Sequence, residues 1–186
     1  MRRLLLAQLL NKVVVKDDEP GTPTVEIDAT GNVSSYESSE EFEITDNSNI
    51  DTGFIPFDGK DFEIHLKATF SYYDNMYVEY PTILNAMDET PPYNGFIIRY
   101  EGSQLYFVHQ SSHWYMNVDK NDIIDVYVTC SEQTVTVTNN GTTVCSFNID
   151  YNINGLTVVV GSSIDANGNP QRYANCTVHE FKVNKK

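Results

Sequence analysis

The chain has 186 residues, enough for one domain with a short appendage. It carries 12 Lys and Arg against 26 Asp and Glu, a formal net charge of −14, which excludes a nucleic-acid binder that needs a cationic surface. With 40% hydrophobic residues the chain is not disordered, and no apolar run approaches the roughly 18 residues of a membrane span.

The first 16 residues differ in charge from the rest, with four basic residues and no acidic one. Their apolar run is short and no small-x-small cleavage site follows, which favours an uncleaved segment over a secretory signal. We therefore predict an anchor arm at residues 1–16 and a Pro/Gly linker at residues 17–24. The predicted anchor residues are Arg2, Arg3, Leu4, Leu5, Leu6, Leu9, Leu10 and Lys12.

Residues 25–186 are predicted to form a single β domain. The chain contains 18 Val, 13 Ile and 16 Thr against 6 Ala and 9 Leu, a balance that suits pleated sheets better than helices. Alternating apolar residues at 62–70, 96–100 and 124–130 are typical of strands with one buried face. We expect about 11 to 13 strands in two antiparallel sheets.

Turns are indicated by Asn-Gly pairs, which tolerate the positive φ of tight hairpins. They occur at residues 94–95, 140–141, 154–155 and 167–168. The second pair lies between two β-rich runs and predicts a hairpin. Residues 85–94 are predicted to be a loop, because Pro91 and Pro92 do not fit the interior of a ladder. Cys130, Cys145 and Cys176 lie in β runs, and we interpret them as buried structural thiols rather than a disulfide framework.

Three segments resemble a known family: IDTGFIPFDGKDFEIHLKATF, PTILNAMDETPPYNGFIIRYEGSQLYF and VVVGSSIDANGNPQRYANCTVHEFKV. Their order is similar to that of the concanavalin A-like jelly rolls, in particular the laminin G-like domains of lectins, matrix proteins and phage virion proteins. The resemblance covers residues 50 to 183. It implies an all-β, two-sheet antiparallel jelly-roll sandwich, here with a short N-terminal arm.

Catalytic signatures are sparse in this sequence. Glu26-Ile27-Asp28 matches only the start of the glucanase motif of this architecture, and the second Glu that a retaining glycosidase needs is missing. His109 and His113 flank two serines, but no Gly-x-Ser-x-Gly elbow is present. We therefore predict that the protein is not an enzyme and that it needs no cofactor.

A cluster of aromatic residues is the candidate ligand site. His113, Trp114 and Tyr115 are consecutive and include the single Trp, and aromatic rings stack well on sugars or partner surfaces. The alternative is that these rings belong to the sandwich core. The residues predicted to join this site are Tyr72, Tyr73 and Tyr77.

Asp165, Asn167 and Asn169 alternate in the segment DANGN. Oxygen ligands at such spacing suit Ca²⁺, and laminin G-like domains often bind calcium at a loop rim, so these residues are the candidate metal ligands. The alternative is an ordinary turn, which the Asn-Gly pair within the segment already explains.

Two functions fit these patterns. The first is a non-enzymatic structural virion protein, such as a decoration, fibre or appendage protein, that docks by its arm and displays a lectin-like jelly roll for host-glycan attachment. The second is a carbohydrate-binding lectin or adhesin module, located extracellularly or at a cell surface. The predicted partners are other virion or assembly proteins and glycans, without nucleic acid or a membrane span, and the predicted state is oligomeric.

Overall fold

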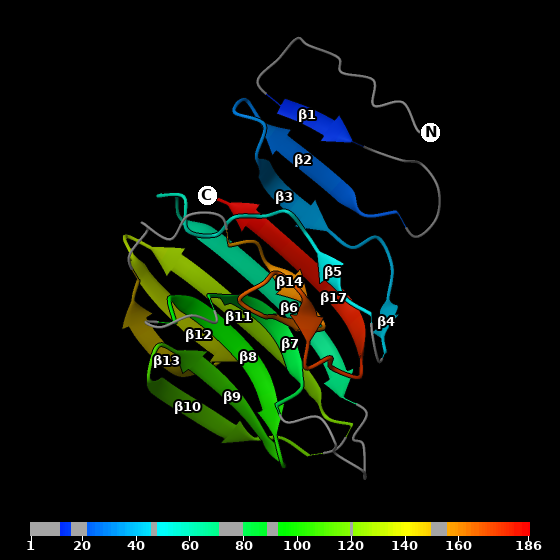
Figure 1. Ribbon diagram of the computed structural model, residues 1–186, viewed down its shortest axis with the longest axis vertical. Helices are drawn as coiled ribbons and strands as arrows, with labels where there is room; N and C mark the ends of the chain where they lie inside the picture. The colour runs from blue at the N-terminus through cyan, green and yellow to red at the C-terminus, as the bar shows by residue number, and fades with distance from the viewer. Residues whose placement is uncertain are drawn as a thin grey trace.

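The computed structural model describes the backbone of residues 12–15 and residues 22–45, 48–70, 80–88, 93–119, 121–149 and 156–186. Over these residues the chain consists of strands and turns without a helix, so the all-β prediction is confirmed. The ladders between named strands are antiparallel, and two sheets stack as a sandwich (Figure 1). In this part of the chain no helix is long and apolar enough to cross a membrane.

The larger sheet has nine strands. In spatial order they are β1 (Lys12–Val15), β2 (Thr24–Asp28), β3 (Val33–Glu37), β17 (Cys176–Lys185), β6 (Phe62–Phe70), β11 (Ile123–Ser131), β12 (Thr134–Asn139) and β13 (Thr142–Asn148), with β4 (Phe42–Ile44) also pairing with β17. One edge of β17 pairs with β6 along its length. Its other edge pairs with β4 at residues 176–178 and with β3 at residues 182–184.

The smaller sheet has six strands, and a short hairpin accompanies it. In spatial order the six are β10 (Ser112–Asn117), β9 (Gln104–His109), β8 (Gly95–Glu101), β7 (Thr82–Met87), β14 (Val159–Val160) and β5 (Ile50–Asp51); the hairpin is β15 (Ser163–Ile164) with β16 (Pro170–Gln171). This sheet has one face toward the core and one outer face. The outer face carries the side chains that concern function.

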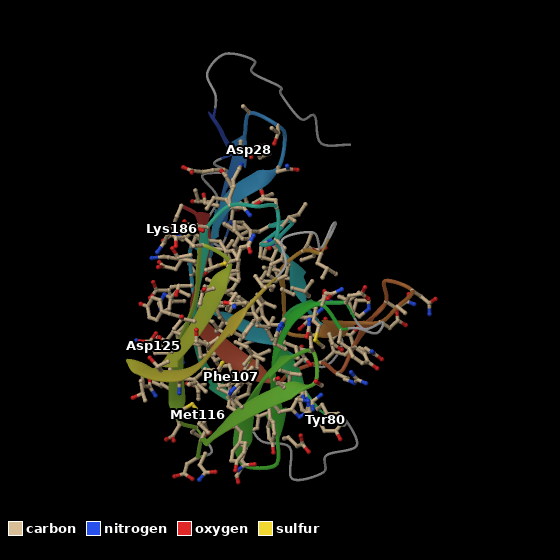
Figure 2. All side chains as sticks on the ribbon, turned by 90° about the vertical axis from the view of Figure 1, so that its left-hand side faces the viewer. Asp28, Tyr80, Phe107, Met116, Asp125 and Lys186 are labelled. Atoms are coloured by element: carbon tan, nitrogen blue, oxygen red, sulfur yellow. The ribbon has the colours of Figure 1, made fainter. Side chains whose placement is uncertain are left out.

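The core lies between the two sheets, and strand alternation builds it. In β6 the side chains of Ile64, Leu66 and Ala68 are fully buried, and they face the other sheet. Ile98 of β8 and Phe107 of β9 are buried from the opposite side, and Figure 2 shows Phe107 between the two layers. Burying such side chains contributes about 1.5–3 kcal/mol each, so the period-2 pattern of the sequence positions the strands.

Two segments differ from the sequence expectations. Residues 1–16 were expected to lie outside the domain, yet β1 (Lys12–Val15) pairs with β2 at the edge of the larger sheet, because a valine run has high β propensity and finds an unpaired edge. The other anchor residues lie outside the described residues. The predicted loop at 85–94 is partly strand, since β7 continues to Met87 and pairs with β8.

The three cysteines are free and buried in the sandwich. This agrees with the prediction of structural thiols. Burial raises the pKa of the Cys145 thiol to about 11. Burial and the neighbouring Glu43 carboxylate raise the pKa of Cys176 to about 12, so both thiols stay protonated in the native protein.

Candidate functional site

Two tyrosines form an exposed aromatic pair on the outer face of the smaller sheet. Tyr115 of β10 lies directly opposite Tyr106 of β9, and their ring centroids are 5.7 Å apart at an interplanar angle of 31°. Tyr115 is 61% exposed, whereas Tyr106 is half-buried. A large, flat, solvent-facing aromatic surface held on two paired strands is suited to stacking against a ligand.

Carboxamide side chains continue this aromatic pair toward the end of the strands. The Tyr106 hydroxyl donates a hydrogen bond of 2.9 Å to Oε1 of Gln104. Gln104 Nε2 in turn donates to Oδ1 of Asn117 at 3.1 Å. The chain of bonds fixes the direction of each group, so donors and acceptors at this edge are oriented before any ligand arrives.

Arg99 of β8 adds a cation beside Tyr106, its partner in the β8–β9 ladder. Its guanidinium lies 4.2 Å from the ring centroid of Tyr80, and its Nη2 lies 3.8 Å from Oε2 of Glu101. Arg99 Nε is buried without a hydrogen-bond partner among the residues that the structure describes. Figure 2 shows Tyr80 on the side of the sandwich opposite Asp125, which lies on the larger sheet. The smaller sheet thus carries aromatic, carboxamide and guanidinium groups on one face.

A small apolar cluster lies next to these polar groups. Met87, Ile97 and Val108 are buried on the outer face, and Tyr106 packs against them. His113 is opposite Val108 in the β9–β10 ladder and is exposed. Apolar side chains that are buried outside the main core give the face a firm floor.

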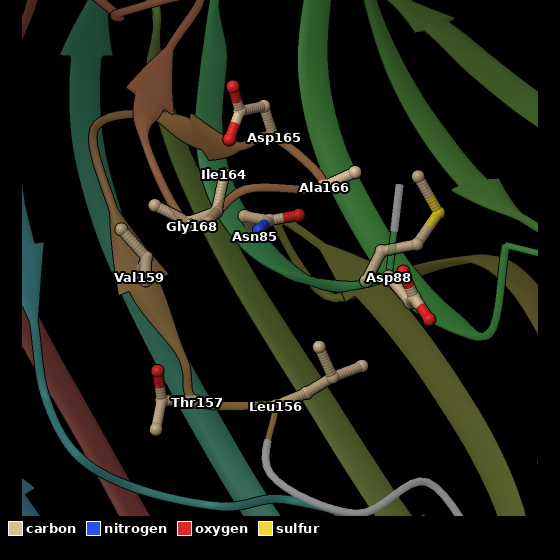
Figure 3. A pocket seen from close by; sticks show the side chains of 10 residues that line it. Asn85, Asp88, Leu156, Thr157, Val159, Ile164, Asp165, Ala166 and Gly168 are labelled. Carbon is tan, nitrogen blue, oxygen red and sulfur yellow. The ribbon is translucent and has the colours of Figure 1, made fainter. Parts of the chain in front are cut away.

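A hollow of about 300 Å³ opens beside this floor, over β7 and β14 and beneath the β15–β16 hairpin (Figure 3). It is lined by Asn85, Met87, Asp88, Leu156, Thr157, Val159, Ile164, Asp165, Ala166 and Gly168. Asn85 is only 2% exposed, and its Oδ1 has no hydrogen-bond partner among the described residues. Figure 3 shows the Asn85 side chain in the midst of the lining residues.

The structure separates the three consecutive aromatic residues of the predicted ligand site. Strand alternation turns His113 and Tyr115 outward and Trp114 inward, where the Trp114 ring stacks on Phe147 of β13 at 5.6 Å and 15°. The same Phe147 stacks on His109 at 4.2 Å, so Trp114 belongs to the packed edge of the sandwich. The other predicted site residues, Tyr72, Tyr73 and Tyr77, lie outside the described residues.

The candidate calcium ligands form a tight turn between β15 and β16. Asp165 Oδ1 accepts hydrogen bonds from the backbone N–H groups of Asn167, at 2.9 Å, and Asn169, at 2.7 Å. These bonds, with that from the Asn169 backbone first, lower the pKa of the Asp165 carboxyl. No cluster of three or more His, Cys, Asp or Glu side chains suited to a metal occurs in the described part of the chain. The Ca²⁺ site stays a prediction.

Glu26 and Asp28, which match the start of a glucanase motif, lie on β2, away from the outer face of the smaller sheet. The Asp28 carboxylate accepts hydrogen bonds from the Thr30 hydroxyl at 2.6 Å and from Lys60 Nζ at 3.1 Å. These bonds hold the pKa of Asp28 well below its usual range, the Thr30 bond being the strongest cause. The Asp28 carboxylate therefore stabilises the β2–β3 turn.

Sequence reasoning missed Tyr106, Arg99 and Asn85. Arg99 lies in the predicted alternating run at 96–100, and it joins the site because it pairs with Tyr106, which in turn pairs with Tyr115. Asn85 was assigned to a loop because of the prolines that follow it. Nothing local in the sequence marks it as a buried carboxamide without a partner.

No protein-family model matches the chain, and no curated protein matches it. Solved structures do match, with low identity. An alginate lyase of polysaccharide lyase family 7, AlgAT5, is 11% identical with a TM-score of 0.52, over 87% of this chain and 82% of that one. The NanB sialidase from Streptococcus pneumoniae is 15% identical with a TM-score of 0.55, over 79% of this chain and 25% of that one.

The receptor binding domain of botulinum neurotoxin type G is 13% identical with a TM-score of 0.51, over 87% of this chain and 45% of that one. The chain thus spans about a quarter of the sialidase and most of the alginate lyase. At these identities the likeness shows the fold alone, an all-β antiparallel sandwich, as the sequence predicted.

The prediction that the protein is not an enzyme is contradicted by the solved structures that share its fold. It relied on the absence of a glucanase carboxylate pair and of a Gly-x-Ser-x-Gly elbow, whereas the solved structures that share the fold include a sialidase and an alginate lyase. A missing glucanase carboxylate pair excludes one chemistry on this fold and leaves the others open, because function depends on the site rather than on the fold.

Proposed function

We propose that the protein is a carbohydrate-recognition β-sandwich that binds glycan on the outer face of its smaller sheet. The observation that carries the proposal is the exposed Tyr115 ring beside Tyr106, on a rigid pair of strands. The C–H groups of a sugar ring pack on such an aromatic face, and the removal of water from both surfaces favours the contact.

The polar groups around the tyrosines suit the hydroxyl groups of a sugar. Gln104 and Asn117 present carboxamides, which both donate and accept, and His113 adds a ring nitrogen on the same face. Arg99 supplies further N–H donors next to Tyr106. An apolar ring flanked by carboxamide, imidazole and guanidinium groups is the kind of surface that orients a hydroxyl-rich ligand.

The solved structures that share the fold include a sialidase and an alginate lyase, which supports a sugar-related role. Recognition of a glycan is common to a binding module and to an enzyme. The virion location, the arm-mediated partners and the oligomeric state stay predictions.

The test measures glycan binding by the full chain and by matched tyrosine variants, on a panel of neutral and acidic oligosaccharides. Tyr115→Ala should weaken binding by roughly tenfold or more, the usual effect of losing an aromatic hot spot. Tyr127→Ala is the control, because Tyr127 is 37% exposed and stacks on His65 at 4.2 Å on the larger sheet. That variant should bind like the wild type.

Trp114→Ala provides a second comparison. Because the ring stacks on Phe147, its loss should lower the melting temperature and leave glycan affinity per folded molecule unchanged. If Trp114→Ala lost binding while Tyr115→Ala kept it, the contact face would be the wrong one. If no glycan in the panel bound, the proposed function itself would fail.

A further inference from the structure

Asn85 is an unusual residue at the base of the hollow. It is nine-tenths and more buried, at 2% exposure, and its Oδ1 lacks a hydrogen-bond partner among the described residues. Native proteins leave few buried polar atoms unpaired, because such an atom has lost its water without gaining a partner. At the wall of a hollow, such an oxygen is placed to accept a hydrogen bond from a bound ligand.

The position of Asn85 is fixed on both sides. In the ladders of the smaller sheet it is paired with Ile97 of β8 and with Val159 of β14. The acceptor is therefore held on a central strand and does not need to be organised when a ligand arrives. The apolar side chains of Met87, Val159 and Ile164 surround it, and so they exclude competing water from part of the wall.

The size of the hollow limits what it holds. Its volume of about 300 Å³ is at the small end of ligand pockets, which commonly run from about 300 to 1,000 Å³. One sugar ring with its hydroxyls fits that volume, whereas a chain of several sugars must extend across the open face toward Tyr106 and Tyr115.

The charge of the hollow selects among sugars. Asp88 and Asp165 are the charged residues of the lining, which holds no Lys, Arg or His among the described residues. The pKa of Asp165 is lowered by the hydrogen bonds that it accepts from Asn169 and Asn167, so this carboxyl is charged at neutral pH. A sugar carboxylate would face like charge in a partly enclosed site, which is unfavourable.

We propose that this hollow is the subsite for one sugar residue without a carboxylate, and that a hydroxyl of that residue donates its hydrogen bond to Asn85 Oδ1. The inference rests on the proposed function, because it places the end of the bound glycan beside the tyrosine face. It also assigns the hollow to neutral sugars, since the two aspartates disfavour a sugar that carries a carboxylate.

The experiment titrates the full chain, by calorimetry, with the methyl glycosides of glucose, galactose, mannose and N-acetylglucosamine. N-acetylneuraminate and glucuronate are the acidic probes. At least one of the four neutral glycosides should bind the wild type, and the acidic probes should bind at least tenfold more weakly. Tighter binding of an acidic probe, or no binding of any neutral glycoside, would overturn the inference.

Two variants locate the binding. Asn85→Leu replaces the unpaired oxygen by a methyl group on a side chain of the same branching, so neutral-glycoside affinity should fall at least tenfold while the melting temperature stays or rises. Ala166→Trp fills the hollow from the exposed hairpin, leaves the strands untouched, and should abolish the same binding. Unchanged affinity in either folded variant would refute the assignment.

The control is Asn139 of β12, the other asparagine that is buried among the described residues. Its Oδ1 accepts from the Asp125 backbone at 3.0 Å and its Nδ2 contacts Met116 Sδ at 3.0 Å, so Asn139→Leu should lower the melting temperature and keep glycoside affinity. If oligosaccharide affinity fell in Tyr115→Ala but was unchanged in Asn85→Leu, the subsite alone would be refuted. If the wild type bound no oligosaccharide at all, the proposed function would be refuted as well.

Discussion

Gly95 is the residue at which a single methyl group should damage the smaller sheet. It is the first residue of β8, with φ of +95°, and it is paired with Met87 of β7. A Cβ at this position would lie 2.0 Å from the carbonyl oxygen of Ala86 and 2.9 Å from the Cα of Met87. Both atoms belong to the backbone of the neighbouring strand, so no side-chain rotation relieves the overlap.

The magnitude follows from two costs. An alanine in left-handed backbone costs about 1–2 kcal/mol, and forcing extra volume into a packed region adds roughly 1–3 kcal/mol. Gly95→Ala should therefore reduce the free energy of unfolding by about 2–5 kcal/mol. Gly141→Ala is the matched control, since Gly141 has φ of +75° and a Cβ there would meet no atom within 4 Å. It should lose only the backbone cost of about 1–2 kcal/mol.

Equilibrium urea unfolding, followed by the fluorescence of the single Trp114, measures both variants. The free energy of unfolding is extrapolated to water and compared at equal slope against urea. Equal losses for Gly95→Ala and Gly141→Ala would refute the reasoning, because the difference between them isolates the contact of β8 with β7.

Three further outcomes are expected. Gly161→Ala should lower the free energy of unfolding by about 2–5 kcal/mol, because its Cβ would lie 2.6 Å from Ile44 Cγ2. In a double-mutant cycle of urea unfolding, adding Ile44→Ala should recover part of that loss. Folding raises the pKa values of Cys145 and Cys176, so these thiols ionise at lower pH in the unfolded chain than in the native protein. The stability that the two protonated thiols contribute is therefore complete below about pH 8.5 and is lost as pH rises above it. Urea midpoints at pH 7.5 and 9.5 should show this fall, and a rise would contradict it. The lowered pKa of Asp165 gives the opposite dependence, because the stability that its carboxylate gives the β15–β16 turn is present above about pH 4 and is lost in acid. At neutral pH, Asp165→Ala should therefore accelerate hydrogen exchange of that hairpin. Unchanged exchange would argue against this role.

The sequence determined the fold class and most of the strands. Alternation of apolar and polar residues at 62–70 and 124–130 is a property of neighbouring residues, and the structure has strands there with the predicted face buried. The Asn140-Gly141 pair likewise fixed the hairpin between β12 and β13, since the turn needs only positive φ from two adjacent residues. Local chemistry was sufficient in each case.

The candidate site was predicted only in part. His113 and Tyr115 lie on the outer face, but Trp114 between them turns inward to Phe147, because adjacent residues of a strand point to opposite sides. Tyr106 enters the site through its register with Tyr115, which the sequence does not state. Composition thus identified the aromatic segment, and strand pairing decided which rings face solvent.

Tertiary structure alone decided the meaning of Gly95 and Asn85. In the sequence Asn94-Gly95 is the same turn signal as Asn140-Gly141, yet Gly95 is pressed against the β7 backbone whereas Gly141 is open to solvent. Asn85 reads as a loop residue before two prolines, yet it lies on a central strand with its oxygen unpaired. The physical reason is that close approach and burial depend on residues distant in the chain, so they exist only after the sheets have paired and stacked.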